Sequence, residues 1–284
     1  MLLSGEEQSA LVGCKFQNTS AARGGALYVD RSHDVDVTAC NFTDTVSDGD
    51  GGAVYLWIAS ATFNSTRFVN TSGDVGGAVY ANDNSVLTFE YCTFDATSAK
   101  SSGGAIHSES TMLLSVRGCT FVAAAAGERG GGLWLGEGAL LSLAATSFKG
   151  ASALSGGAVF AFRAKSLTMD SVHFSDNVAT AAGGALFCQA CDRLDLLKSS
   201  FSNNYAEIGA AIYGSNLVET WIIANTSFSN NTALGQGAFD PTRACMLPIY
   251  PSEDPVCTQL RRTPHFDHGM VFKDLGGGSS TKRP

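Results

Sequence analysis

Phenylalanine recurs every 26 or 27 residues along most of the chain, and this period constrains the fold more than any other feature. The column consists of Phe16, Phe42, Phe68, Phe94, Phe121, Phe148, Phe174, Phe201 and Phe228. A glycine-rich tetrapeptide follows each Phe by eight or nine residues, starting at Gly24, Gly51, Gly76, Gly103, Gly130, Gly156, Gly183, Gly209 and, in a weaker form, Gln236. Self-similarity at a fixed period means that one supersecondary unit is stacked about nine times.

The repeating unit has the pattern of β-strands. Positions seven and five residues before each Phe are mostly apolar, with polar or small residues between them, as in Val35 and Val37. This period of two predicts a strand with one buried face. The position three before the Phe is often small, which predicts a corner before the strand that holds the Phe. The glycine-rich tetrapeptide opens a further strand, such as residues 24–29, so we expect three short strands per repeat.

Short strands that return after about 26 residues predict an all-β fold, a single-stranded parallel β-helix (solenoid) of about nine coils. Glycine, 32 of 284 residues, would cost about 1 kcal/mol at each position of an α-helix. Coils about 4.8 Å apart would stack the phenylalanine rings on one another. All six prolines follow the last repeat, as expected if the strands before them need their N–H groups. We therefore expect a β-helix repeat domain at 1–240 and a proline-containing C-terminal cap and flexible tail at 241–284.

Two recurring motifs point to a known family. GGA[ILV] recurs in most repeats, and FxxN is complete at 174–177, 201–204 and 228–231. Together they resemble the repeat of the chlamydial polymorphic outer membrane proteins, over about residues 11–239. The resemblance implies a right-handed parallel β-helix of the pectin-lyase-like kind. It also implies an adhesin at the cell surface or outside the cell.

The start of the chain shows no evident secretory leader, since Met1-Leu2-Leu3 is followed directly by polar residues. We therefore expect either a segment of a longer exported protein or a relative that uses the same repeat elsewhere.

Charge and hydropathy limit the classes of partner that we expect for this chain. The net charge is −8, and the repeat lacks the basic stripe that phosphate contacts require, so we expect no nucleic-acid partner. No run of eighteen apolar residues predicts a membrane span. No motif for a cofactor is present. The resemblance to the polymorphic outer membrane proteins implies protein or glycan surface ligands, bound through the long faces of the solenoid.

Four cysteines share one repeat position, two residues before the Phe: Cys14, Cys40, Cys92 and Cys119. Neighbouring coils are close enough for Cys14–Cys40 and Cys92–Cys119 disulfides. The alternative, which we favour, is a column of small buried residues, because Thr, Val or Ser fills the same position on other coils.

The remaining cysteines form two pairs. Cys188 and Cys191 have CxxC spacing, but no second pair completes a zinc site and no strand–turn–helix context supports a redox role. Cys245 and Cys257 flank a proline-rich loop and are the favoured disulfide.

Six N-x-[ST] sequons are candidates for N-glycosylation: Asn18, Asn41, Asn64, Asn70, Asn225 and Asn230. The alternative is structural, since turns of a β-helix favour Asn, Ser and Thr, and stacked Asn side chains can bond one another. The sequence leaves both open.

Catalytic groups do not line up along the repeat. Asp48, Asp50 and Asp74 gather in two neighbouring turns; we interpret them as solvated, with an isolated calcium contact as the alternative. The five histidines occupy unrelated repeat positions. The sequence favours a non-enzymatic protein; the alternative is a polysaccharide lyase or glycoside hydrolase of the same fold.

The two ends of a solenoid expose strand edges. Residues that we expect to cover the last coil are Met246, Leu247, Ile249 and Tyr250. Only Leu2 and Leu3 offer apolar cover before the first coil, so we expect weak end-to-end self-association there.

Overall fold

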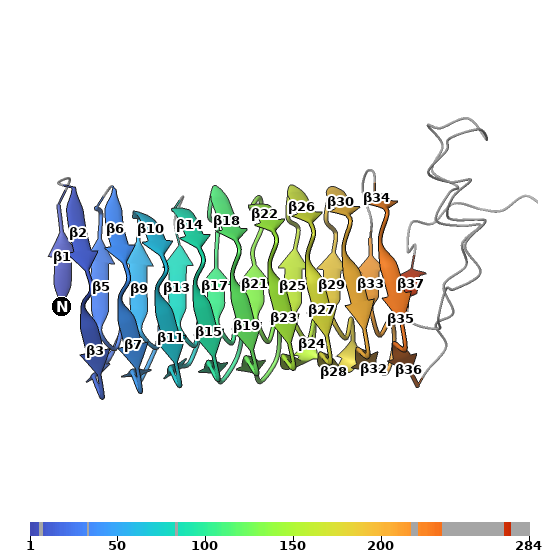
Figure 1. Cartoon of the computed structure of the whole chain (residues 1–284), viewed down its shortest axis with the longest axis horizontal. Helices are drawn as coiled ribbons and strands as arrows, with labels where there is room; N and C mark the ends of the chain where they lie inside the picture. The colour runs from blue at the N-terminus through green and yellow to red at the C-terminus, as the bar shows by residue number, and fades with distance from the viewer. Residues whose placement is uncertain (6–7, 33, 83–84, 217–220, 235–269, 274–284) are drawn as a thin grey trace, which may run out of the picture.

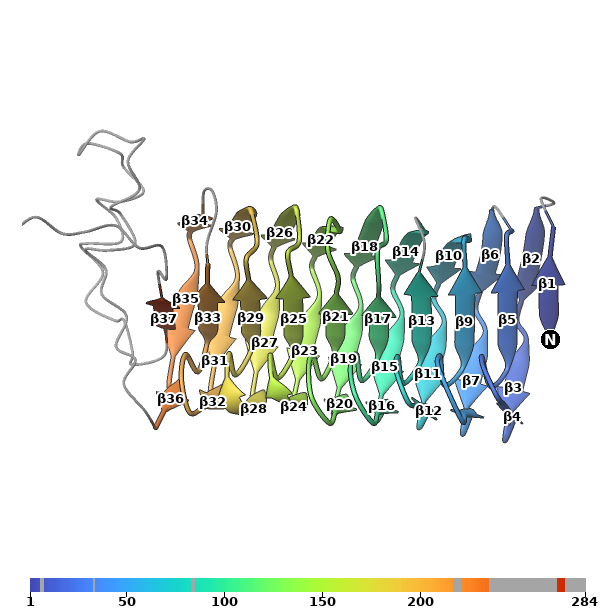
Figure 2. The ribbon, with the colours of Figure 1, turned by 180° about the vertical axis from the view of Figure 1, so that it is seen from behind.

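The computed structural model describes residues 1–5, 8–32, 34–82, 85–216, 221–234 and 270–273, and every regular element in these ranges is a β-strand. The strands wind into coils stacked along one axis, with β1 at one end and β36 near the other (Figures 1 and 2). Strands pair in parallel with the equivalent strand of the next coil, so each sheet runs the length of the stack. This confirms the predicted parallel β-helix and its approximate number of coils.

Four sheets result, which we call sheets A to D. Sheet A consists of β1 (Leu2–Ser4), β5 (Leu27–Asp30), β9 (Val54–Trp57), β13 (Val79–Asn82), β17 (Ile106–Ser108), β21 (Leu133–Leu135), β25 (Val159–Phe162), β29 (Leu186–Gln189), β33 (Ile212–Ser215) and β37 (Met270–Lys273). Sheet B consists of β2 (Ser9–Val12), β6 (Val35–Thr38), β10 (Ser60–Asn64), β14 (Val86–Glu90), β18 (Leu113–Arg117), β22 (Leu140–Ala144), β26 (Ser166–Asp170), β30 (Arg193–Leu197) and β34 (Trp221–Ala224).

The phenylalanine column lies in sheet C. Its strands are β3 (Lys15–Gln17), β7 (Asn41–Thr43), β11 (Arg67–Val69), β15 (Thr93–Asp95), β19 (Thr120–Val122), β23 (Ser147–Lys149), β27 (His173–Ser175), β31 (Ser200–Ser202) and β35 (Ser227–Ser229). Sheet D consists of β4 (Ser20–Ala21), β8 (Val46–Ser47), β12 (Ser72–Gly73), β16 (Ser98–Ala99), β20 (Ala125–Ala126), β24 (Ser152–Ser155), β28 (Val178–Ala182), β32 (Tyr205–Ala206) and β36 (Thr232–Ala233). Sheets B and D run along opposite long edges of the solenoid (Figures 1 and 2).

Sheet D corrects the expectation of three strands per coil. Most of its strands are only two residues long and lie within the polar segment that the sequence predicts as a turn. Ladder bonds nevertheless form, such as Val46 N–H to the Thr19 carbonyl at 2.9 Å. Two residues cannot show a period of two, so the hydropathy pattern carries no signal for these strands.

Corners between sheets B and C lie at the predicted position, three residues before each Phe. All nine residues there adopt the left-handed conformation, with φ between 48° and 65°. Tyr91 and Lys198 occupy two of these corners, so the corner requires the backbone conformation rather than a small side chain.

The core is the predicted phenylalanine stack. Ring centroids of successive Phe residues from Phe16 to Phe228 lie 4.5–5.1 Å apart with interplanar angles of 18° or less. Phe42 to Phe201 are fully buried, whereas the terminal Phe16 is half-buried. Each coil thereby buries one large apolar ring against its two neighbours.

The asparagine of the FxxN motif builds a second, polar ladder inside the solenoid. Asn177 Nδ2 donates to Asn204 Oδ1 and Asn204 Nδ2 donates to Asn231 Oδ1, both at 2.9 Å. Each side chain also bonds backbone groups, as in Asn204 Nδ2 to the Phe174 carbonyl at 3.1 Å. The side-chain amides are therefore buried with their hydrogen bonds made.

Earlier coils carry threonine at the position of this asparagine: Thr19, Thr45, Thr71 and Thr97. Their buried Oγ1 atoms have no hydrogen-bond partner among the described residues. At this repeat position the threonine hydroxyls make none of the cross-coil hydrogen bonds that the Asn amides make.

The two ends of the solenoid differ. The first-coil strands β1 to β4 each have a partner on one side only within the described part of the chain. At the other end, β37 from the tail pairs with β33. Met246, Leu247, Ile249 and Tyr250 lie outside the described residues, so the predicted cap, the 1–240 and 241–284 division and the self-association stay predictions.

Candidate functional site

An aromatic column that the sequence pattern alone did not lead us to predict runs along the outer face of sheet A. In each strand the residue between two inward-facing residues points outward, as Tyr28 does between Leu27 and Val29. The column consists of Tyr28, Tyr55, Tyr80, His107, Trp134, Phe160, Phe187 and Tyr213. The signal was present in the sequence: the fourth residue after the first glycine of the tetrapeptide is aromatic or His in all eight coils.

Most rings of this column cover one another. Tyr28 and Tyr55 have centroids 4.8 Å apart, Tyr55 and Tyr80 5.2 Å apart, and His107 and Trp134 4.0 Å apart. Tyr55 is consequently only 4% exposed and Tyr80 8%. The faces of the stacked rings are therefore closed to solvent, and polar groups beside the rings are the ones that a ligand can reach.

Charged groups surround the tyrosine part of the column. Tyr80 donates its hydroxyl hydrogen to Glu109 Oε2 at 2.9 Å, and the Arg23 guanidinium lies 5.4 Å from the Tyr55 ring centroid. The Asp50 carboxyl interacts electrostatically with Arg23 and Glu109. We call Arg23, Asp50, Tyr55, Tyr80 and Glu109 the tyrosine–carboxylate cluster. Arg23 and Asp50 precede β5 and β9, whereas Glu109 follows β17, so the charges approach from opposite ends of the strands.

Burial shifts the titration of two groups in this cluster. The pKa of Asp50 is raised, mainly by loss of solvent and further by Asp74 and Glu109, while Arg23 opposes the shift. The pKa of Tyr80 is also raised, by burial first and by its hydrogen bond to Glu109. Tyr80 therefore stays a hydrogen-bond donor, and Asp50 takes up a proton more readily than a solvated aspartate.

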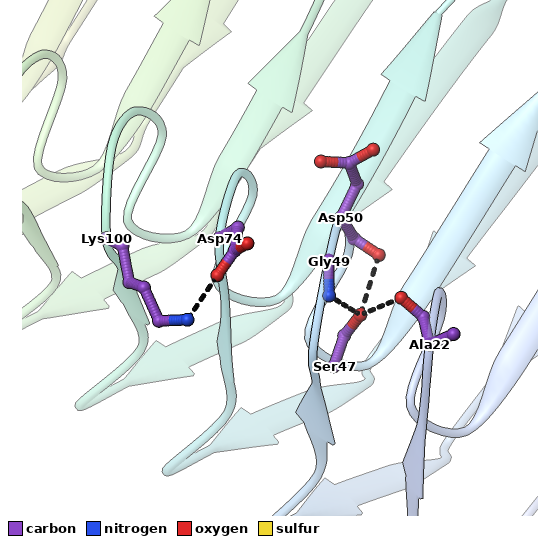
Figure 3. Close-up of polar contacts among 6 residues, drawn as sticks. All are labelled: Ala22, Ser47, Gly49, Asp50, Asp74 and Lys100. Carbon is purple, nitrogen blue, oxygen red and sulfur yellow. Dashed lines mark hydrogen bonds and ion pairs between the residues drawn. The ribbon is translucent and has the colours of Figure 1, made fainter.

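The predicted calcium candidates are not brought together as a metal site. Figure 3 shows the Lys100 ammonium on the Asp74 carboxylate, 2.5 Å away, and the Asp50 carboxylate pointing away from its own turn. That turn is held by Ser47 Oγ, which donates toward the Asp50 and Ala22 carbonyls at 3.1 Å. In the described ranges no three His, Cys, Asp or Glu side chains, Asp48 included, group so as to hold a metal ion.

The cysteine column is buried from its second member onward. Cys14, Cys40, Cys92 and Cys119 are free thiols in this structure. The Cys92 N–H donates to Cys119 Sγ at 3.3 Å, as Cys14 N–H does to Cys40 Sγ. The hydrogen bond to Cys119 and burial raise the pKa of the Cys92 thiol.

A disulfide joins Cys188 and Cys191, whose Cα atoms lie 5.9 Å apart. The sequence alone assigned no role to this pair, although its CxxC spacing was visible. Cys245 and Cys257 lie outside the described residues, so their pairing stays a prediction.

The six sequons lie on sheets B and C and their corners. Asn41 begins β7 and Asn64 ends β10. Asn225 lies between β34 and β35, and Asn18, Asn70 and Asn230 directly follow strands of sheet C. Asn18, Asn70, Asn225 and Asn230 are exposed, whereas Asn41 and Asn64 are half-buried.

His107 lies inside the aromatic column, between Tyr80 at 5.2 Å and Trp134 at 4.0 Å. Burial lowers the pKa of His107 to about 3. Histidine in the unfolded chain has a pKa near 6.5. The contribution of neutral His107 to stability is therefore fully present above that pH and is lost progressively as the pH falls toward 3. At pH 4.5 we expect the free energy of unfolding to be lower by about 2–3 kcal/mol because of His107.

His107→Phe keeps a ring in the stack and removes the titration. Urea unfolding at pH 7.5 and 4.5 should show a smaller acid loss for this variant than for the wild type. The carboxylates are present in both chains, so their contribution to the acid loss cancels in the comparison. An equal loss of stability in the wild type and in His107→Phe would contradict the assignment to His107.

Comparison with known families supports the fold and the repeat. A family model described as a right-handed β-helix region matches residues 2–142, and one described as the Chlamydia polymorphic membrane protein repeat matches residues 171–189. No curated protein and no solved structure shows significant similarity to the chain. In the described ranges there is no helix of the length and apolarity that crossing a membrane requires.

Proposed function

Because the chain is a right-handed parallel β-helix that carries the Chlamydia polymorphic membrane protein repeat, we propose that it is an adhesin-like binding protein displayed at the cell surface or outside the cell. Its ligand, a protein or a glycan, lies along the outer face of sheet A. The observation that carries this proposal is the tyrosine–carboxylate cluster, which places several hydrogen-bonding groups on neighbouring coils.

The chemistry of the cluster indicates the kind of ligand group. The cluster contains two carboxylates, Asp50 and Glu109, and one guanidinium, Arg23. It therefore suits hydroxyl-rich or cationic groups better than phosphate or sulfate. Strands of adjacent coils repeat about every 4.8 Å, which suits an extended ligand laid along the solenoid axis. Ring faces are covered and the Tyr80 hydroxyl hydrogen is already bonded to Glu109, so affinity comes from hydrogen bonds to the carboxylates and the guanidinium beside the rings.

A binding assay on the intact chain tests this proposal. We expect binding to neutral glycans on an array, or to proteins of another cell surface, that falls at least tenfold, about 1.4 kcal/mol, in Glu109→Gln and Asp50→Asn. Glu137→Gln is the matched control, because Glu137 is an exposed carboxylate paired with Arg163 in the turn between sheets A and B. Equal binding by all four chains would place the ligand elsewhere.

A specific observation supports a second candidate, a glycan-cleaving enzyme. Burial raises the pKa of Asp50, as a general acid requires, and Glu109 is a second carboxylate whose charge acts on it. Incubation with neutral polysaccharides separates the two functions. Release of reducing ends that Asp50→Asn abolishes would favour the enzyme; binding without turnover favours the adhesin-like protein.

A further inference from the structure

The six sequons occupy one side of the solenoid. All lie between the last residue of a sheet B strand and the corner that follows sheet C: Asn18, Asn41, Asn64, Asn70, Asn225 and Asn230. That interval is seven residues of a repeat of 26 or 27. Sheet A, sheet D and the turns that join D to A carry no sequon. Any glycans attached at these sequons would therefore lie on the same side of the solenoid.

Four of the six side chains are exposed, Asn41 and Asn64 are half-buried, and the contacts of Asn70 and Asn64 survive modification. Asn18 and Asn70 stand at exposed corners with φ near +50°. Asn70 Nδ2 donates to Asp44 Oδ1 at 2.6 Å, and a glycosylated amide retains one N–H for this bond. Asn64 uses only Oδ1, which accepts from Ser65 Oγ at 2.7 Å, so its Nδ2 is left for the sugar.

We propose that the chain is N-glycosylated on its sheet C side alone, and that the sheet A side is left bare for the ligand. The second half of this inference rests on the proposed function. In the modification, Asn Nδ2 attacks the anomeric carbon of a lipid-pyrophosphate-linked oligosaccharide. The carbon–oxygen bond to the pyrophosphate breaks, one amide proton leaves, and the lipid pyrophosphate is released. The glycans cover sheet C and its corners, whereas the tyrosine–carboxylate cluster lies along sheet A.

Site occupancy tests the first half. The full chain is secreted from a eukaryotic host, and its peptides are analysed by mass spectrometry after enzymatic deglycosylation in heavy-oxygen water. Occupied asparagines become heavy aspartates. We expect occupancy at the exposed Asn18 and Asn70 in most molecules. Unmodified asparagine at both positions would overturn the inference.

A new sequon on the other side tests the second half. Lys100→Asn creates one over positions 100–102, in the turn that joins sheet D to sheet A, and breaks the pair with Asp74. Lys100→Gln breaks the same pair without a sequon and is the matched control. On the neutral glycan array we expect the glycosylated Lys100→Asn chain to bind at least tenfold more weakly than Lys100→Gln, and deglycosylation to restore binding.

Three outcomes separate the two proposals. Equal binding by both Lys100 variants, with the new site occupied, would overturn the bare-face inference. If glycosylation of the natural sequons abolished ligand binding by the wild-type chain, that result would also overturn the bare-face inference, because the glycans would then cover the ligand face. Occupied natural sequons in a chain that binds nothing would overturn the proposed function and leave one-sided glycosylation standing.

Discussion

Replacing Phe121 by alanine is expected to destabilise the solenoid by about 3–5 kcal/mol. The ring is fully buried and stacks on Phe94 at 4.6 Å and on Phe148 at 4.5 Å. Removing it opens a cavity in the middle of the column, and rigid coils on both sides limit how far the cavity can collapse. Urea unfolding followed by circular dichroism measures the loss.

Phe16→Ala is the matched control at the end of the same column. Phe16 is half-buried and stacks on one ring, Phe42, at 4.8 Å. Its removal should cost clearly less, because the first coil can fray without opening the rest of the stack. Equal destabilisation by the two variants would contradict a stack whose stability comes from nearest-neighbour contacts.

Gly104→Ala is expected to be the second severe variant, with a loss of at least about 3 kcal/mol. The two glycines of the tetrapeptide have different physical roles. Gly103 has φ +66°, which glycine tolerates best, whereas Gly104 has an ordinary conformation. A Cβ at Gly104 would overlap the backbone carbonyls of Gly131 and Ala125, and backbone cannot rotate away as a side chain can.

Gly150→Ala separates this steric effect from backbone strain. Gly150 has φ +65°, and a Cβ added there would meet no atom within 4 Å, so only the left-handed conformation opposes alanine. Ala96 and Ala123 already occupy equivalent corners with φ +51° and +50°. We expect a cost of about 1 kcal/mol in the same unfolding assay. A Gly104→Ala chain as stable as Gly150→Ala would show that the coils can separate to accept a methyl group.

The site itself was only partly predictable from the sequence. The outer aromatic column repeats with the period of the chain, so its signal was available. The contact between Tyr80 and Glu109 was not, because the two residues lie 29 positions apart and occupy different places in the repeat. Only the winding of the coils brings them together. The Lys100–Asp74 pair likewise depends on adjacent turns.

The repeat pattern was sufficient to predict the solenoid, its period, the inward phenylalanine column and the corner before it. These features recur in every coil, and stacking at a fixed spacing turns identical positions into neighbours. The tertiary structure alone decided the presence of sheet D, the different roles of Gly103 and Gly104, and the gathering of charges around Tyr80. The physical reason is that backbone pairing and cross-coil side-chain contacts depend on what the next coil places opposite, and hydropathy along one coil carries no record of that.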